Sequence, residues 1–169
     1  MNETHNRQTF SEWLALTEAG KNAAKVDWIK KRDEWKGHFT ISGIEYNIHV
    51  YTDDDTSTDF EIWEFKFYKD EHTTKITDDF AGHFILVPTI KNAFEEFIKE
   101  KTPDAALFLA ADKSKSRKSL YKQNSDHIGS KYNYISINPM LDNNDTLFGV
   151  CKEQYMVDEV KKLIKRSYI

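Results

Sequence analysis

A run of basic residues at a predicted helix start is the part of this sequence best suited to hold an anion. The run consists of Lys113, Ser114, Lys115, Ser116, Arg117 and Lys118. Either serine can cap a helix, and the backbone amides at a helix N-terminus favour negative charge. We therefore predict that Lys113–Lys118 binds a phosphate-bearing ligand or an acidic partner. A solvated basic face is the alternative interpretation of the same residues.

Two His-x-Thr patterns could supply a pair of imidazoles for acid–base chemistry. His38-Phe39-Thr40 and His72-Thr73-Thr74 have the pattern of the two-histidine phosphoesterases, in which one imidazole acts as the acid and the other as the base. The second pattern lies in a polar stretch rather than on an apolar strand. Patterns this short also arise by chance, so the pair alone does not predict an enzyme.

Acidic residues gather in two stretches that could bind a hard cation. These residues are Asp53, Asp54, Asp55, Asp59, Asp142 and Asp145. Neither stretch has the ordered spacing of a calcium-binding loop, and exposed acidic loops have the same composition. Cys151 has no neighbouring pattern that would make it a nucleophile. We predict no metal site.

Length and composition favour one soluble domain. The chain has 169 residues, a formal net charge of −4 and 14% aromatic residues, enough large side chains for a core. The negative charge argues against nucleic-acid binding by bulk phosphate neutralisation. The single cysteine excludes an internal disulfide, no apolar run reaches the length of a membrane span, and the N-terminus lacks a signal peptide. We expect a cytoplasmic protein.

The basic run is predicted to lie between two strands. Ala105–Ala111 is a short apolar run flanked by breakers, which favours a buried strand. The next residues predict a helix that begins at Ser114 or Ser116 and ends at Gly129, with Leu120, Tyr121, Asn124 and Ile128 at helical spacing. Tyr132–Ile137 alternates with period two and predicts the second strand.

The rest of the chain supplies further helices and strands. Helices are predicted near Thr9–Leu16 and over Ala23–Trp35, from Thr89 or Asn92 after the interruption at Pro88, and over Glu153–Arg166. Strands are predicted over His38–Ser42, Ile44–Tyr51, Phe60–Tyr68, Phe80–Val87 and Leu147–Val150, and Phe60–Tyr68 is placed centrally because both its faces are apolar.

These elements predict a single α+β domain with a central mixed, mostly antiparallel sheet flanked by helices. Residues 1–36 would form N-terminal helices, residues 37–137 a sheet core with two helices, and residues 138–169 a C-terminal extension and helix.

The order of elements and one sequence stretch resemble the GNAT-type acetyltransferases. The stretch reads LFLAADKSKSRKSLYKQ. Leu120-Tyr121 stands in the place of the family's Leu-Tyr pair, Ser114 at its Asn position, and Gly129 to Tyr132 matches its Gly-aromatic strand entry loosely. The similarity covers Phe84–Ile137. It implies a GNAT-like domain, acetyl-CoA as the cofactor and Tyr121 as the general acid.

The sequence departs from this family where the cofactor's pyrophosphate would bind. The family has a Gln/Arg-x-x-Gly-x-Gly/Ala loop there, whereas Val87–Phe94 contains no glycine, and Pro88 removes a backbone N–H. We therefore expect a noncatalytic GNAT-like protein, without a cofactor, that binds another macromolecule, most simply a protein. The alternative is a divergent acyl-CoA-dependent N-acyltransferase that holds acetyl-CoA at Lys113–Lys118.

The small size, acidic charge and aromatic-rich composition also resemble accessory proteins encoded by bacteriophages. This resemblance implies an inhibitor or modulator of a host factor that acts in the host cytoplasm.

Overall fold

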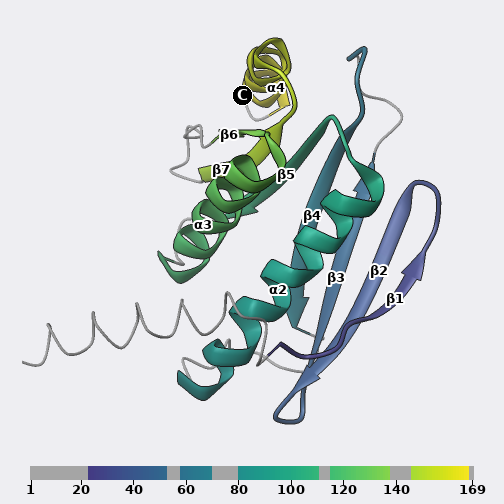
Figure 1. Ribbon diagram of the computed structural model, residues 1–169, viewed down its shortest axis with the longest axis vertical. Coiled ribbons are helices and arrows are strands. Elements are labelled where there is room, and N and C mark those ends of the chain that lie inside the picture. Colours follow the sequence, from purple (N-terminus) through teal and green to yellow (C-terminus); the bar gives the residue numbers. More distant parts are fainter. Residues whose placement is uncertain (1–22, 53–57, 70–79, 111–114, 138–145, 168–169) are drawn as a thin grey trace, which may run out of the picture.

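The computed structural model describes residues 23–52, 58–69, 80–110, 115–137 and 146–167. They form one α+β domain in which a seven-strand sheet packs against three helices (Figure 1), so the predicted fold class is confirmed. The elements are β1 (Asp27–Lys30), β2 (Glu34–Ile41), β3 (Ile44–Thr52), β4 (Ile62–Lys69), α2 (Phe80–Lys101), β5 (Ala105–Ala110), α3 (Lys115–Tyr132), β6 (Ile135–Ile137), β7 (Thr146–Cys151) and α4 (Gln154–Ser167).

The strands lie in the order β1-β2-β3-β4-β5-β7-β6, so β4 is central, as predicted. Neighbouring strands are antiparallel except for β4 and β5, which are parallel. That parallel pair runs only from Ile62↔Ala105 to Glu64↔Leu107. Beyond it the two strands are no longer hydrogen-bonded to each other, and side chains must occupy the space between them.

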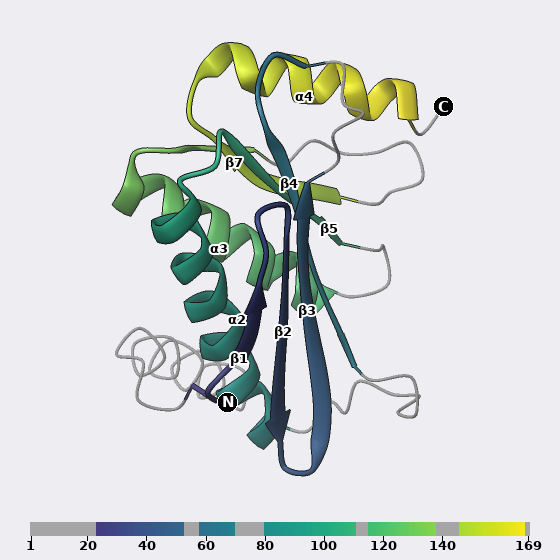
Figure 2. The ribbon, with the colours of Figure 1, turned by 90° about the vertical axis from the view of Figure 1, so that its right-hand side faces the viewer.

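The helices lie on both faces of the sheet, and each face has its own apolar core. Figure 2 shows α2 and α3 along one face and α4 across the end near β7, and the buried residues under α4 belong to the face opposite α2 and α3. The larger core lies under α2 and α3 and is rich in aromatic residues, such as Trp35, Phe65 and Phe94. The smaller one joins α4, through Val157 and Val160, to β5, β6 and β7. No helix in the described ranges is long and apolar enough to cross a membrane.

The prediction of a helix over Ala23–Trp35 is wrong, because this segment forms β1, a tight turn and the start of β2. The amide of Lys31 donates to the carbonyl of Glu34 at 2.8 Å and closes the turn. Trp28 and Trp35, which helical spacing would have placed on one stripe, lie on adjacent strands with ring centroids 5.4 Å apart. Asp33 is the one common turn residue among Lys31–Asp33, and without a glycine or proline beside it the apolar spacing was misleading. The helix predicted near Thr9–Leu16 lies outside the described residues.

The strand predicted over Phe80–Val87 is also wrong, since these residues begin the helix α2. Pro88 does not end that helix, although it lacks the N–H of one helical hydrogen bond. Buried side chains recur at helical spacing on both sides of it, and this stripe offsets the lost bond. The stripe consists of Leu86, Ile90, Ala93, Phe94, Phe97 and Ile98. Val87–Phe94 therefore forms no glycine-rich loop because it lies inside the helix α2.

The helix α3 continues through Gly129, where it was predicted to end, and stops at Tyr132. Asn133 takes the left-handed conformation (φ 61°) in which helices commonly end, and asparagine tolerates it. The strand predicted from Tyr132 is consequently shorter and begins at Ile135. At the β2–β3 turn, Ser42 and Gly43 both have positive φ, 50° and 79°, as a two-residue hairpin requires.

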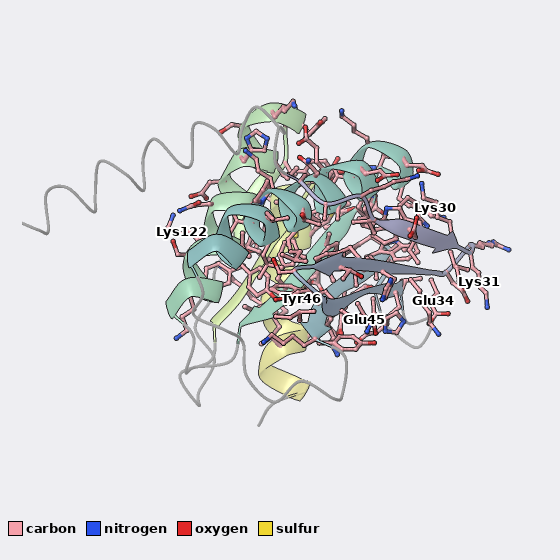
Figure 3. All side chains as sticks on the ribbon, turned by 90° about the horizontal axis from the view of Figure 1, so that it is seen from below. Lys30, Lys31, Glu34, Glu45, Tyr46 and Lys122 are labelled. Atoms are coloured by element: carbon pink, nitrogen blue, oxygen red, sulfur yellow. The ribbon has the colours of Figure 1, made fainter. Side chains whose placement is uncertain are left out.

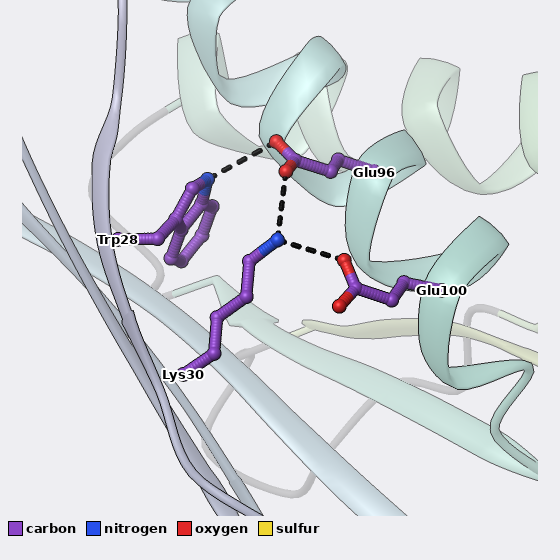
Figure 4. Close-up of polar contacts among 4 residues, drawn as sticks. All are labelled: Trp28, Lys30, Glu96 and Glu100. Carbon is purple, nitrogen blue, oxygen red and sulfur yellow. Dashed lines mark hydrogen bonds and ion pairs between the residues drawn. The ribbon is translucent and has the colours of Figure 1, made fainter.

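Polar contacts fix the edge strand β1 to α2 (Figure 4). The Lys30 ammonium lies 3.0 Å from a Glu96 oxygen and 2.7 Å from a Glu100 oxygen, and the indole N–H of Trp28 donates to Glu96 at 3.1 Å. Lys30 also lies 4.4 Å from the centre of a Trp35 ring. Hydrogen bonds to Glu100 and Glu96 outweigh partial burial and raise the pKa of Lys30, so its positive charge persists.

Cys151 is expected to be chemically inert while the protein is folded. It is fully buried in β7, and burial raises the pKa of its thiol from 9.0 to about 12. Because only the thiolate attacks, alkylation in mildly alkaline buffer should be about a thousandfold slower than in the unfolded chain, counting the thiolate fraction alone.

The raised pKa of Cys151 also predicts how stability depends on pH. The folded state favours the protonated thiol, so this contribution to stability is fully present below pH 9.0 and is lost as the pH rises from there to about 12.

Iodoacetamide labelling with and without denaturant tests the predicted low reactivity of the Cys151 thiol. Equal rates in the two conditions would contradict the burial of the thiol.

Candidate functional site

The structure places the predicted basic segment at the start of α3 but describes only part of it. Lys113 and Ser114 lie outside the described residues, and Lys115, Ser116 and Arg117 form the first helical turn, with only their backbone described. Lys118 is half-buried. The helix start is thus as predicted, and anion binding by this turn stays a prediction.

Tyr121 lies inside the larger core, where it packs against aromatic rings. It is 2% exposed, its ring stacks on Phe108 with centroids 5.0 Å apart, and Phe67 and Phe148 lie at 5.9 and 6.2 Å. Phe67 belongs to β4 and Phe108 to β5, beyond the last paired residues of the two strands. Tyr121 therefore contributes to the packing between β4 and β5. A role as a general acid would require a substrate to reach this buried position.

The other candidate residues are dispersed. His38 lies on β2 with its Nε2 4.0 Å from a Glu45 oxygen, while its possible partner His72 lies outside the described residues. Most of the acidic stretches, Asp53–Asp55 and Asp142–Asp145, are likewise outside them. In the part of the chain that is described, no three His, Cys, Asp or Glu side chains come together as metal ligands would.

The face of β1–β4 turned away from α2 presents mostly polar side chains that are exposed or half-buried. We call it the open sheet face. Strand alternation and register place these residues on it: Asp27, Ile29, Glu34, Lys36, His38, Thr40, Glu45, Asn47, His49, Tyr51, Glu64, Lys66 and Tyr68. The side chains of Lys36, Glu45 and Lys66 are 63%, 54% and 53% exposed. In Figure 3, α2 and α3 lie on the opposite side of the sheet from labelled Glu34 and Glu45.

A polar network connects three strands across this face. Nε2 of His49 donates to Oε1 of Glu34 at 2.6 Å, since a carboxylate can only accept. On the next pair of strands, the Tyr51 hydroxyl donates to Glu64. The Lys66 ammonium lies 3.6 Å from Glu64 and 5.2 Å from the centre of the Tyr51 ring. The His49 and Tyr51 rings are 4.6 Å apart and join the two halves of the network.

These contacts favour the ionised form of Glu34 and Lys66 and the neutral form of Tyr51. The hydrogen bond from His49 lowers the pKa of Glu34, which therefore stays ionised in mildly acidic solution. Contact with the Tyr51 hydroxyl, and the charge of Glu64, raise the pKa of Lys66. Partial burial and the hydrogen bond to Glu64 raise the pKa of Tyr51, so its hydroxyl stays a donor. The hydrogen bonds thus order these side chains and favour the charged forms of Glu34 and Lys66.

The open sheet face carries a negative balance and two exposed apolar groups. Its four carboxylates, on Asp27, Glu34, Glu45 and Glu64, exceed its two ammonium groups, on Lys36 and Lys66. Ile29 is 65% exposed and Tyr68 is 47% exposed. A surface of this composition can recognise a partner through charge, hydrogen bonds and a few apolar contacts.

Sequence reasoning missed the part of this face formed by Asp27, Ile29 and Glu34, because it assigned Ala23–Trp35 to a helix. The signal was nevertheless present in Ile44–Tyr51, which was correctly predicted as a strand. Glu45, Asn47, His49 and Tyr51 alternate there with apolar residues, which marks one solvated face. Alternation could not predict the register of β2 and β3, which brings His49 next to Glu34.

Comparison of the sequence with models of known protein families finds no match, and a search of curated proteins finds no relative. The resemblance of Phe84–Ile137 to the acetyltransferases therefore stays a hypothesis about ancestry. The geometry of the described residues carries the functional argument.

Proposed function

We propose that this protein is noncatalytic and acts by binding another protein through the open sheet face. The observation that carries the proposal is the partly exposed, hydrogen-bonded network from Glu34 to Lys66, which presents ordered charges over three strands. Its negative balance suits a partner with a basic surface. The bacteriophage resemblance implies that this partner is a host factor.

Charge complementarity explains how such a surface would select its partner. Complementary potentials speed encounter and disfavour partners of like charge, while contacts at the centre determine how long the complex lasts. Tyr68 is suited to prolong the lifetime of the complex, because an exposed aromatic ring buries a large area on binding at a small entropic cost. Side chains already held by hydrogen bonds lose less freedom on binding.

The test compares two variants that change the net charge equally. Glu45→Lys combined with Glu64→Lys reverses two charges on the open sheet face, and Asp158→Lys combined with Glu159→Lys reverses two on α4. A partner captured from a lysate of the native host is purified and titrated by calorimetry against each variant. We expect the sheet-face variant to bind at least about tenfold more weakly, which corresponds to about 1.4 kcal/mol, and the α4 variant to bind within about twofold of the wild type.

Added salt should weaken binding of the wild type more than binding of the sheet-face variant. Equal loss in both variants would mean that only net charge matters. Unchanged binding in both would place the interface elsewhere. Circular dichroism before each titration shows whether the variants are folded.

The alternative proposal is a divergent GNAT-type acyltransferase. It is supported by the basic helix start at Lys115–Lys118 and by the strand–helix–strand order of β5, α3 and β6. Calorimetry with acetyl-CoA separates the two proposals. Micromolar binding would contradict the noncatalytic proposal as stated, and no binding by the folded protein would remove the support for acyl transfer.

A further inference from the structure

A polar hollow at one end of the sheet, distinct from the open sheet face, carries a second inference. Its volume is about 540 Å³, and it is lined by Arg32, Asp33, Thr52, Glu61 and Lys101. These residues come from the β1–β2 turn, the end of β3, the residue before β4 and the last residue of α2. Four separate parts of the chain thus converge on one small, solvent-accessible space.

Hydrogen bonds among these four parts hold the hollow in shape. The amide of Thr52 donates to the carbonyl of Asp33 at 3.1 Å, and the Thr52 hydroxyl donates to the carbonyl of Ile62 at 2.8 Å. The Lys101 ammonium donates to the carbonyl of Arg32 at 2.9 Å and lies 5.4 Å from the centre of a Trp63 ring. A binding site built in this way needs little rearrangement when a ligand enters.

In the part of the chain that the structure describes, the charged side chains of the hollow form no ion pairs with one another. Among the described residues, the guanidinium of Arg32 and the carboxylates of Asp33 and Glu61 have no ion pair or side-chain hydrogen bond with any other group. The Lys101 ammonium donates to a backbone carbonyl rather than to a carboxylate. Two cations and two anions therefore border one space, with most of their hydrogen-bonding capacity available to a ligand.

We propose that this hollow binds a small zwitterion, of which a free α-amino acid is the simplest class. A carboxylate on the ligand fits the Arg32 fork and Lys101, and an ammonium group fits Asp33 and Glu61. A ligand with only negative charge would meet repulsion from the two carboxylates, and a purely cationic ligand would meet it from Arg32 and Lys101. A ligand that carries both signs satisfies all four groups. The proposal does not depend on the open sheet face.

The test titrates the full chain with three uncharged-side-chain probes and follows backbone amides by NMR. L-Alanine is a zwitterion, N-acetyl-L-alanine is an anion and L-alaninamide is a cation. We expect L-alanine to shift the amides of Arg32, Thr52 and Glu61 with a Kd on the order of millimolar, because exposed ion pairs are individually weak. The two derivatives should bind at least about tenfold more weakly.

Variants then assign the binding to the two kinds of charge. Arg32→Gln and Glu61→Gln should each weaken L-alanine binding by about fivefold or more, whereas Lys161→Gln and Asp158→Asn on α4 should leave it unchanged. No shift with L-alanine, equal binding of all three probes, or insensitivity to both hollow variants would each overturn the proposal. Amide shifts away from the hollow provide the check that each variant is folded.

Discussion

Replacing Phe108 by alanine is expected to lower the free energy of unfolding by about 3–5 kcal/mol. Phe108 is fully buried, and its ring lies 4.2 Å from that of Phe94, 5.2 Å from Phe65 and 5.0 Å from Tyr121, measured between centroids. Removing it takes away the transfer free energy of a whole ring and leaves a cavity that these rigid neighbours can fill only in part.

Urea denaturation followed by tryptophan fluorescence measures the effect of Phe108→Ala. Tyr68→Ala is the matched control, because it also removes an aromatic ring, but one that is 47% exposed. The control should cost less than about 1 kcal/mol. A similar cost in the two variants would mean that the aromatic cluster between β4 and β5 is not tightly packed.

Replacing Gly149 by valine is expected to destabilise the fold by about 3 kcal/mol, through crowding rather than cavity formation. A Cβ atom at position 149 would lie 2.6 Å from the carbonyl oxygen of Ala106 and 2.8 Å from Cδ2 of Leu107. The first of these is a backbone atom in β5, which cannot withdraw without disturbing its pairing with β7.

Gly43→Asn separates this crowding from the general effect of losing a glycine. Gly43 has a φ of 79° and nothing within 4 Å of an added Cβ, and asparagine tolerates that conformation. We expect its cost to stay below about 1 kcal/mol in the same denaturation experiment. Equal effects of Gly149→Val and Gly43→Asn would contradict the close approach of β5 and β7.

Several elements could be predicted because one local signal dominates them. The apolar run at Ala105 between breakers gave β5, the amphipathic stripe around Val157 and Val160 gave α4, and alternation gave β3 and β4. In each of these the local pattern and the tertiary environment favour the same structure. The mixed, mostly antiparallel sheet follows from their order.

The elements that were predicted wrongly are those in which tertiary contacts override a local rule. Pro88 usually interrupts a helix, but the apolar stripe of α2 continues past it onto the sheet. Gly129 usually ends a helix, but Asn133 takes the left-handed position instead. Trp28 and Trp35 fit a helical period, yet a turn between them brings their strands together.

The candidate sites could not be predicted from the sequence. His49 and Glu34 are fifteen positions apart, and only the pairing of β2 with β3 brings them within 2.6 Å. The hollow likewise joins Arg32 to Lys101 through tertiary structure alone. Strand register and tertiary contacts bring together residues that are far apart in the sequence, and no local spacing pattern predicts such a site.

The short parallel pairing of β4 with β5 has a consequence for how the molecule holds together. Among the described residues, the backbone joins the two halves of the sheet at this seam only from Glu61 to Glu64. Beyond the paired residues, contacts between aromatic rings of β4 and β5, such as Phe65 and Phe108, hold the two halves together. Cooperative unfolding of the two halves as one unit thus depends chiefly on side-chain packing, and the seam is where independent opening of each half would begin.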